Sequence, residues 1–496
     1  MENFKDKFTM VFLAVLKVLM IIVIIASAGT IFVFHILVHT ENFIKNFIIV
    51  FLITASVLAV EFYIIKKDLY YKKQLFLILF CGFILRGLWL LNINSIPTSD
   101  FRFIYESAQE FLNGSTSMFW GTSYIARFPH LTMMVFYMSL MIKIFPTNNI
   151  LMMKFVNLAL GILTIYIIYL MIKEIFNSNK KGICAAALAA VFPPFVTYTG
   201  VFCTENIAIP LYLLSAYIFI LALRGKKNKY YLILSGLILS LGNLFRMVGI
   251  IMIIAYAMYI IIYSRDKMIH KIINIVLYII PYFMLLFLVS STLQNLKITE
   301  FPLWKGSEPK ITSVLKGTNM ESNGKWNEED AAISQKYNYD YEKITEASEE
   351  IIKERLTTTP TLELIGFYIK KFALQWSMGD FDGIIWTKFD VPREDIIVDV
   401  SLEVPQIIYT ITMILIFLGM LNRKNNKENQ EINLFYIILC GYGAMYLVTE
   451  SQGRYSYIIS WIFVILAVEG INFLLNIKNM KDINKFNKNE KLENVV

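Results

Sequence analysis

The sequence predicts an all-α polytopic membrane protein, a helical bundle that crosses the bilayer many times. Of its 496 residues, 57% are hydrophobic and only 17% are charged, and the mean hydropathy is +0.57. The apolar residues form long runs with few charges, which is typical of helices that span a bilayer. Short clusters of lysine and arginine separate these runs, as in loops on the cytoplasmic side. The net charge of +8 therefore reflects membrane orientation, and we expect no nucleic-acid partner.

The apolar runs predict roughly 11 to 13 transmembrane helices. The first two, about 9–36 and 46–65, begin and end near lysines, which favours a cytoplasmic N-terminus. The third run, about 74–91, then leads outward. Further spans are expected at about 150–172, 183–200, 206–223, 230–245, 247–263, 272–292, 405–421, 433–449 and 456–476.

The stretch 131–172 allows two interpretations. It holds two apolar pieces on either side of Pro146-Thr-Asn-Asn149. Two crossings would put Lys173, Lys180 and Lys181 outside, whereas the positive-inside rule favours a single net crossing. The piece before the turn is then short, tilted or re-entrant.

Composition divides the chain into five parts. Residues 1–73 form two additional N-terminal helices, and 74–292 form a transmembrane core with a first extracytoplasmic loop at 92–130. Residues 293–404 are rich in charges and prolines and are expected to form a second extracytoplasmic region. Residues 405–476 return to the membrane, and 477–496 form a basic cytoplasmic tail.

The stretch from Asn94 to Gly114 is the first candidate for chemistry. Asp100 precedes an amphipathic helix that is expected to lie in the membrane interface. Its apolar side is formed by Phe101, Ile104, Tyr105, Ala108, Phe111 and Leu112. A carboxylate at the start of such a helix is placed to meet a substrate carried by a lipid. The alternative is that Asp100 only satisfies free amides in the first helical turn.

Other ionisable residues fall on the same outer face under this topology. They are Arg127, Glu205, Arg246, Gln452 and Arg454, the last beside Tyr455. Arginines can hold a leaving phosphate and a carboxylate can accept the proton of an incoming hydroxyl, so the set suits group transfer from a lipid phosphate. The alternatives are snorkelling arginines and interfacial salt bridges that contribute little stability.

The second outer region contains a loop rich in glycine and asparagine, from Gly317 to Asn327. Asn319 and Trp326 are residue types that hydrogen-bond to sugars and stack on them, although tight turns with a membrane anchor explain the loop equally well. Two helices are expected after it, a charged one at about 328–356 and an amphipathic one at about 361–376. Asp380 and Asp382 lack the further ligands of a calcium loop and are interpreted as a turn.

Metal and disulfide chemistry have no sequence support. The four cysteines lie in or beside apolar runs, and the four histidines are scattered without a metal-binding pair. We therefore expect no cofactor, although a divalent metal remains compatible with the sequence.

Taken in order, several short motifs resemble the membrane-embedded glycosyltransferases of the GT-C fold. The resemblance is to family 39, which includes the protein O-mannosyltransferases and the aminoarabinose transferases. It covers about 74–476 and rests on an Arg86-bearing span before Pro97-Thr-Ser-Asp100, Tyr105-x-x-Ala108, Arg127-Phe-Pro129, Pro193-Pro194 with Thr204-Glu205, and Glu450-Ser-Gln-Gly-Arg454-Tyr455. Frequent isoleucine, lysine and asparagine with few arginines favour a bacterial source.

The resemblance implies roles for individual residues. Asp100 corresponds to the catalytic base, Glu205 to a second acid that orients Arg127 or the acceptor, and Arg127 to the basic residue before the proline. The chain departs from the family in having Ser99 where many members have an adjacent acid. It also has Ala126-Arg127-Phe128-Pro129 in place of Glu-Lys-Pro, and the lost glutamate argues against a metal.

The implied function is sugar transfer from a polyprenyl-phosphate donor to an acceptor, with inversion, at the outer face of the cell membrane. The acceptor would be a lipid, a wall polymer or a protein. Arg127, Arg246 and Arg454 would hold the phosphate, and the Gly317–Trp326 loop would cover the acceptor side. The rival function is transport or flipping of a lipid-linked sugar, which should place ionisable groups near the membrane midplane on broken helices.

Overall fold

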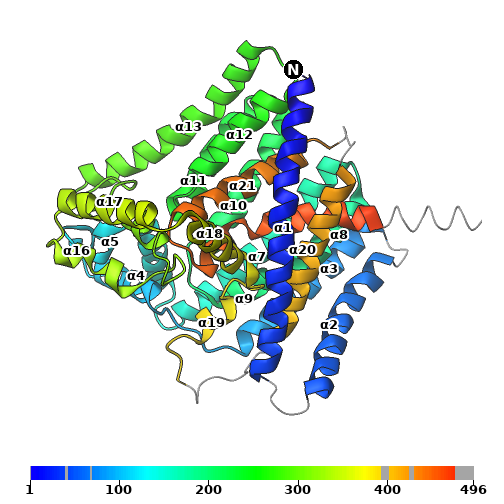
Figure 1. The fold of residues 1–496 in the computed structure, drawn as a ribbon, viewed down its shortest axis with the longest axis horizontal. Coiled ribbons are helices and arrows are strands. Elements are labelled where there is room, and N and C mark those ends of the chain that lie inside the picture. The colour runs from blue at the N-terminus through cyan, green and yellow to red at the C-terminus, as the bar shows by residue number, and fades with distance from the viewer. Residues whose placement is uncertain (1, 39–42, 67–69, 393–401, 424–428, 475–496) are drawn as a thin grey trace, which may run out of the picture.

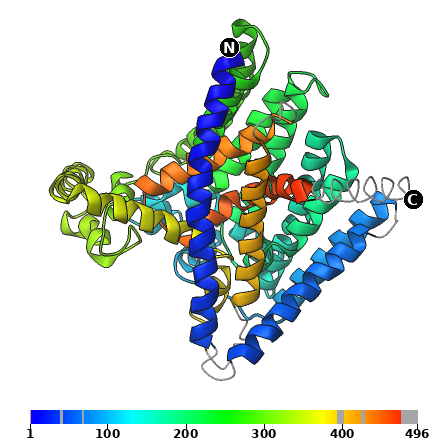
Figure 2. The same cartoon turned by 45° about the vertical axis from the view of Figure 1, so that its right-hand side comes forward.

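The computed structural model describes residues 2–38, 43–66, 70–392, 402–423 and 429–474, and within these ranges the regular structure is helical throughout (Figure 1). The predicted cytoplasmic tail, 477–496, lies outside the described residues. Helices α1 (Glu2–Val38) and α20 (Glu403–Asn422) lie side by side, and α2 (Phe43–Lys66) also packs on α20 (Figures 1 and 2).

Seven helices in the described ranges are long and apolar enough to cross a membrane. They are Phe4–Ile36 within α1, α3 (Tyr71–Leu91), α7 (Asn149–Phe176), α10 (Glu205–Leu223), α13 (Met268–Asn295), α20 and the last helix, Gly453–Leu474. Two bent pairs raise the number to nine if each is one span. Shorter apolar helices are Ile48–Val60 within α2, α11 (Tyr231–Phe245), α12 (Ile250–Tyr263) and α21 (Ile432–Val448). The predicted all-α polytopic class is confirmed, and its predicted number of spans is reached only if the short helices also cross.

Helix α6 (Thr132–Ile144) bears on the open question of the 131–172 stretch. It runs antiparallel to α4 (Asp100–Leu112), since Phe136 packs on Phe111 at 5.1 Å and the Ser139 hydroxyl donates to the Ala108 carbonyl at 3.1 Å. Thirteen helical residues extend only about 20 Å, less than the hydrocarbon core. We therefore interpret α6 as sharing the layer of α4, with α7 as the single crossing.

The predicted break at Pro193-Pro194 separates α8 (Asn179–Val191) from α9 (Pro193–Thr197) and the 3-10 turn η3 (Tyr198–Gly200), with a bend of 60°. The prolines have no N–H, so they cannot bond to the carbonyls of Ala189 and Ala190 four residues earlier. The buried Arg86 guanidinium from α3 bonds to both carbonyls instead, at 3.3 and 3.0 Å. An arginine in an apolar span thus stabilises the break.

Helices α10 and α11 form an antiparallel pair that brings Glu205 and Arg246 to the same end. Ser215 and Ser235 donate to each other's carbonyls at 2.9 and 3.0 Å. Gly242 faces the Tyr212 ring, and a Cβ there would come within 2.7 Å of it. The small residues let the two helices approach closely and fix their register.

Residues 311–388 form short helices, and most of them make a lobe at one side of the helical body (Figures 1 and 2). They are α14 (Ile311–Gly317), α15 (Glu328–Ala331), α16 (Ile333–Lys336), α17 (Tyr341–Thr358), α18 (Thr361–Ser377) and α19 (Gly383–Lys388). The expected single helix at 328–356 is wrong, because Asn338 and Tyr339 adopt positive φ of 48° and 59°, which no continuous α-helix allows. The expected helix at 361–376 corresponds to α18.

Candidate active site

Asp100 is the first residue of α4 and its carboxylate is 38% exposed. The preceding Ser99 has a φ of 48°, in the left-handed region, and its side chain makes no capping bond. The Asp100 carboxylate accepts a hydrogen bond from Arg454 Nη2 at 3.2 Å, and the Tyr124 hydroxyl lies against the same carboxylate. The strained backbone at Ser99 and these two contacts fix the orientation of the Asp100 carboxylate.

Arg454 lies at the start of the last helix, in the 3-10 segment η6 (Gly453–Ile459), and is 6% exposed. Its guanidinium carbon is 4.9 Å from the ring centres of Phe101 and Trp386 and 5.6 Å from that of Tyr455. Three aromatic faces therefore confine the cation. Its Nε is buried and has no hydrogen-bond partner in the described part of the chain.

A second pair lies next to the first. Arg246 Nε is 3.4 Å from Glu205 Oε1, and Thr204 donates to the other Glu205 oxygen at 3.0 Å. Glu205 is 1% exposed and also interacts electrostatically with Arg454. The Arg246 guanidinium lies 5.0 Å from the Tyr455 ring centre, so Tyr455 is flanked by both arginines.

Helix α18 holds the turn that carries Arg454. Lys371 is buried and donates to the carbonyls of Gly317, Leu447 and Thr449 at 2.7 to 2.8 Å. One helical turn later, Gln375 donates to the Gln452 carbonyl at 2.8 Å. Two side chains on one helix face thereby fix the backbone on both sides of the turn.

The predicted turn at Asp380 and Asp382 contacts the segment that carries Arg454. Phe381 and Asp382 have φ of 52° and 65°, and the Phe381 carbonyl accepts a hydrogen bond from Tyr198. The Asp382 carboxylate lies so close to Gly453 that a Cβ there would come within 2.2 Å. Asp380 accepts from the Ile384 amide at 2.7 Å, and burial raises its pKa to about 7.

The polar side chains of the 449–455 turn form a small network beside this cluster. Gln452 Nε2 donates to Glu450, whose other oxygen is 3.5 Å from Lys316 Nζ. The Tyr455 hydroxyl reaches the same Glu450 oxygen as Gln452, at 3.4 Å. Gln452 is therefore oriented by an acid that the sequence prediction did not assign a role.

Arg127 has a different partner from the one expected. Its Nε and Nη2 both donate to one oxygen of Glu308, and its guanidinium carbon lies 5.3 and 5.6 Å from the ring centres of Phe128 and Tyr339. Glu205 pairs with Arg246, so the expected orientation of Arg127 by Glu205 is not what the structure shows. Glu308 stands alone in sequence beside Pro309, so no local pattern pointed to this pair.

Three further predicted residues lie apart from the Asp100–Arg454 contact. Tyr105 donates to Asn149 at 2.8 Å. Asn319 donates to Asp330 at 3.1 Å and accepts from the Ser322 amide, which makes it part of a turn. Trp326 is 56% exposed on the lobe formed by residues 311–388.

The site also contains residues that the sequence prediction missed. Tyr124 and Trp386 contact the Asp100–Arg454 pair, and neither carries a local motif. His130 interacts electrostatically with Arg246, Glu205 and Asp100. Its place directly after Arg127-Phe-Pro129 was the available signal.

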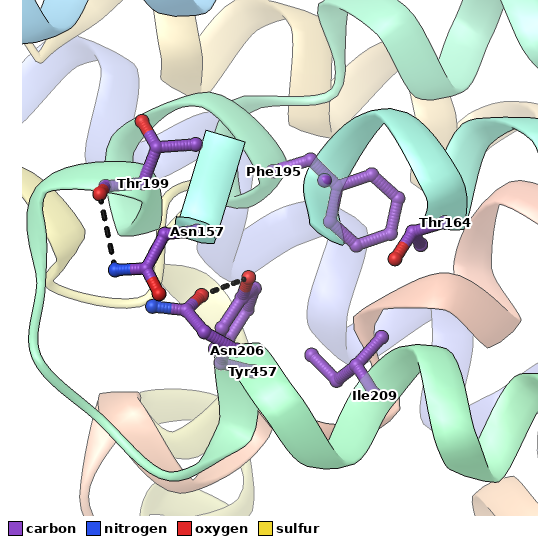
Figure 3. Close-up of a pocket in the computed structure, with 8 residues that line it drawn as sticks. Asn157, Thr164, Phe195, Thr199, Asn206, Ile209 and Tyr457 are labelled. Carbon is purple, nitrogen blue, oxygen red and sulfur yellow. Dashed lines mark hydrogen bonds between the residues drawn. The ribbon is translucent and has the colours of Figure 1, made fainter. Parts of the chain in front are cut away.

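A small cavity of about 10 Å³ lies at the turn that precedes Glu205 (Figure 3). Asn157 donates to the Thr199 carbonyl at 3.2 Å, and Tyr457 donates to Asn206 at 2.9 Å. Its size fits one water molecule, and its hydrogen bonds fix the 198–206 turn. Among the described residues, no three His, Cys, Asp or Glu side chains gather as they would around a metal ion.

Membrane-length helices and a buried cluster of acids and arginines at helix ends together define the class: a polytopic membrane protein with a charged site built from distant segments. Residues 130–293 match the profile of the dolichyl-phosphate-mannose-protein mannosyltransferase family. The resemblance to membrane glycosyltransferases of the mannosyltransferase group is confirmed over this segment. Glu205 and Arg246 lie inside it, whereas Asp100 and Arg454 lie outside.

Solved structures of the oligosaccharyltransferase of Archaeoglobus fulgidus also match. A crystal structure with zinc and sulfate has a TM-score of 0.47 and 14% identity, and the match covers 81% of this chain and 50% of that one. The apo form has a TM-score of 0.47 and 13% identity, and the match covers 84% of this chain and 52% of that one. The structure of the oligosaccharyltransferase AglB with an inhibitory peptide and a dolichol-phosphate has a TM-score of 0.42 and 13% identity. That match covers 86% of this chain and 52% of that one. The chain thus spans about half the length of these proteins, and no curated protein sequence matches it significantly.

Proposed function

We propose that the protein transfers a sugar from a lipid-phosphate donor of the polyprenyl type to an acceptor hydroxyl at the outer face of the cell membrane. The family match over residues 130–293 supports a lipid-linked donor, because the name of that family specifies dolichyl-phosphate-mannose. The donor sugar and the acceptor class stay open.

The reaction proceeds by one inverting displacement. The Asp100 carboxylate removes the proton of the acceptor hydroxyl while the acceptor oxygen attacks the anomeric carbon from the side opposite the phosphate. The bond between that carbon and the phosphate oxygen breaks, and its electron pair leaves with the lipid phosphate. The products are an inverted glycoside, the lipid phosphate and protonated Asp100, which returns its proton to water.

Arg454 and Arg246 stabilise the charge that develops on the leaving phosphate. Their side chains are only 7% and 14% exposed. Arg454 Nε has no hydrogen-bond partner among the described residues, whereas Arg246 Nε faces Glu205. Buried guanidinium donors act more strongly on a developing anion than donors in water. Glu205 fixes Arg246 and, through its charge, the neighbouring Arg454.

The observation that carries the proposal is the 3.2 Å contact between Asp100 and Arg454, two residues 354 positions apart. A carboxylate that only capped α4 would need no such partner. Here the acid, the cation and its three aromatic walls come from three separate segments of the chain. This contact supports the proposed roles, because it brings the proposed base next to the proposed phosphate-binding arginine.

The test is transfer by the purified protein in lipid vesicles, with polyprenyl-phosphate mannose as the first donor and release of polyprenyl phosphate as the readout. Asp100→Asn should lower the rate roughly 10²- to 10⁴-fold. The matched control is Glu106→Gln, which removes an exposed acid from the same helix. Wild-type turnover in the Asp100→Asn protein would remove Asp100 from the mechanism.

A further inference from the structure

A second polar cavity lies between α4 and the start of α7. It has a volume of about 420 Å³ and is lined by Tyr105, Pro146, Thr147, Asn148, Asn149, Ile150, Leu151 and Lys154. Tyr105 follows Asp100 by five residues, which is about 7.5 Å along the helix axis and about 140° around it. The cavity therefore lies on a different side of α4 from the Asp100–Arg454 contact.

Lys154 is the unusual residue of this cavity. It is 6% exposed, and it has no hydrogen-bond or ion-pair partner among the described residues. A largely buried lysine without a counter-charge is unfavourable, and ionisable residues within membrane-length helices are rare unless they serve a function. None of the lining residues is acidic.

The N-terminus of α7 adds positive potential at the same place. The Met152 amide makes the first backbone bond at this end, to the Asn148 carbonyl, so the amides of Asn149 to Leu151 have no intrahelical acceptor. Asn148 is the N-cap residue, and its side chain makes no capping bond. Lys154 lines the same cavity as Asn149, Ile150 and Leu151, and helical side chains generally tilt toward the N-terminus. Two positive groups thus face one cavity, and an anion would stabilise both.

The surroundings indicate where the anion comes from. Leu151 lines the cavity, and Leu140, Ile144 and Phe155 belong to the adjoining ends of α6 and α7; each of the four is at least 41% exposed. A polar cavity rimmed by exposed apolar side chains suits a head group whose acyl chains lie along the protein. A free phosphate ion would make no use of this rim.

We infer that this cavity binds the phosphate group of an anionic lipid, held by Lys154 and the free amides of α7, at a site separate from the one that performs transfer. The inference is independent of the proposed reaction, because it concerns binding alone. It assigns Tyr105 a positioning role, since its hydroxyl orients Asn149 at the cavity wall.

The test measures binding of phosphatidylglycerol to the full-length protein in neutral detergent by native mass spectrometry, with phosphatidylcholine as the zwitterionic comparison. Lys154→Met should weaken phosphatidylglycerol binding roughly 10- to 100-fold and leave phosphatidylcholine unchanged. The matched control is Lys143→Met, which removes an exposed lysine from the end of α6. Equal phosphatidylglycerol affinity in wild type and Lys154→Met would overturn the inference.

A second variant tests the site without removing a buried residue. Asn148→Asp puts a favourable capping carboxylate at the α7 N-terminus, so the fold should be retained while anions are repelled. It should weaken phosphatidylglycerol binding as Lys154→Met does, and unchanged binding would count against the site. Thermal shifts with inorganic phosphate at constant ionic strength identify the source. A Lys154-dependent shift shows that phosphate alone suffices, and its absence beside Lys154-dependent lipid binding assigns the site to the lipid.

Discussion

Arg454 shows how much a single side chain depends on its surroundings. A lysine would keep the charge, but it would lose the planar stacking on Phe101 and Trp386 and the fork that can bind two phosphate oxygens. Arg454→Lys should therefore lower kcat/KM roughly 10- to 100-fold, mainly through a higher KM for the lipid donor. Initial rates over a range of donor concentrations measure this.

The control for that change is Arg102→Lys, at an exposed pair with Glu106 on α4. Such pairs contribute little, so its kinetics should stay within about twofold of wild type. If Arg454→Lys were equally active, Arg454 would be an interfacial anchor and the phosphate would be held elsewhere.

At the residue scale, the sequence could indicate which side chains are unusual but not which ones meet. Asp100, Glu205, Arg246 and Arg454 stood out because each interrupts apolar sequence or precedes an amphipathic run. Their pairing could not be predicted. Glu205 was expected to orient Arg127 or the acceptor, and Arg127 instead pairs with Glu308. Residues that pair between distant segments have no characteristic spacing in the sequence from which the pair could be predicted.

At the scale of the helix, α18 acts as a clamp on the turn that carries Arg454. Lys371→Met would leave three backbone carbonyls without their donor, and an unsatisfied buried group costs about 1 to 3 kcal/mol. We expect a clearly lower thermal midpoint and a raised donor KM, because the turn loosens. Differential scanning fluorimetry and donor titration measure the two effects.

Lys370→Met is the matched control, since Lys370 is the exposed neighbour on the same helix. It should change neither the midpoint nor the donor KM. A Lys371→Met protein with a lowered midpoint but an unchanged KM would restrict Lys371 to stability.

The turn before α19 should make stability depend on pH. Burial raises the pKa of Asp380 to about 7, above the ordinary value of 3.8, so the folded state retains a proton that the unfolded chain releases. The stabilisation of the folded state by protonated Asp380 is fully present below pH 3.8 and is lost as the pH rises through about 7. The thermal midpoint of the wild type should fall between about pH 5.5 and pH 8 more than that of Asp380→Asn, which keeps an oxygen for the Ile384 amide. Parallel pH profiles of the two proteins would contradict this.

At the same scale, helix positions were predictable where apolar periodicity is strong and failed where it is weak. The residues of α3, α10 and α13 lie close to the predicted runs because length and hydropathy decide them. The region 328–356 is mostly charged and polar, and its isoleucines at 333, 344, 351 and 352 do not mark the break at Asn338 and Tyr339. Two consecutive residues with positive φ override its helical composition.

For the whole molecule, the lysine clusters predict which side of the membrane each loop faces. Single cysteines at Asn113 and Trp326, both exposed, should react with an impermeant maleimide added to intact cells. A cysteine at Lys227, also exposed, should react only after the membrane is opened. The background has the four native cysteines replaced.

The labelling result bears directly on the proposed site. Trp326 lies on the lobe formed by residues 311–388, and Asn113 follows α4, which begins with Asp100. Reaction of both from the cytoplasmic side alone would place the Asp100–Arg454 contact inside and exclude a transfer at the outer face.

The contacts of Arg86 also have a consequence for how the protein is made. During synthesis, α3 leaves the ribosome well before α8, and Ala190 follows Arg86 by 104 residues. Until then its guanidinium lacks the carbonyls that later receive it. An arginine in an inserted helix is unfavourable by up to about 2.5 to 3.5 kcal/mol, the value at the helix centre, and Arg86 lies five residues before the end of α3. We therefore expect the third helix to settle fully in the bilayer only after the proline-broken helix arrives, which would couple the membrane insertion of two segments far apart in the chain.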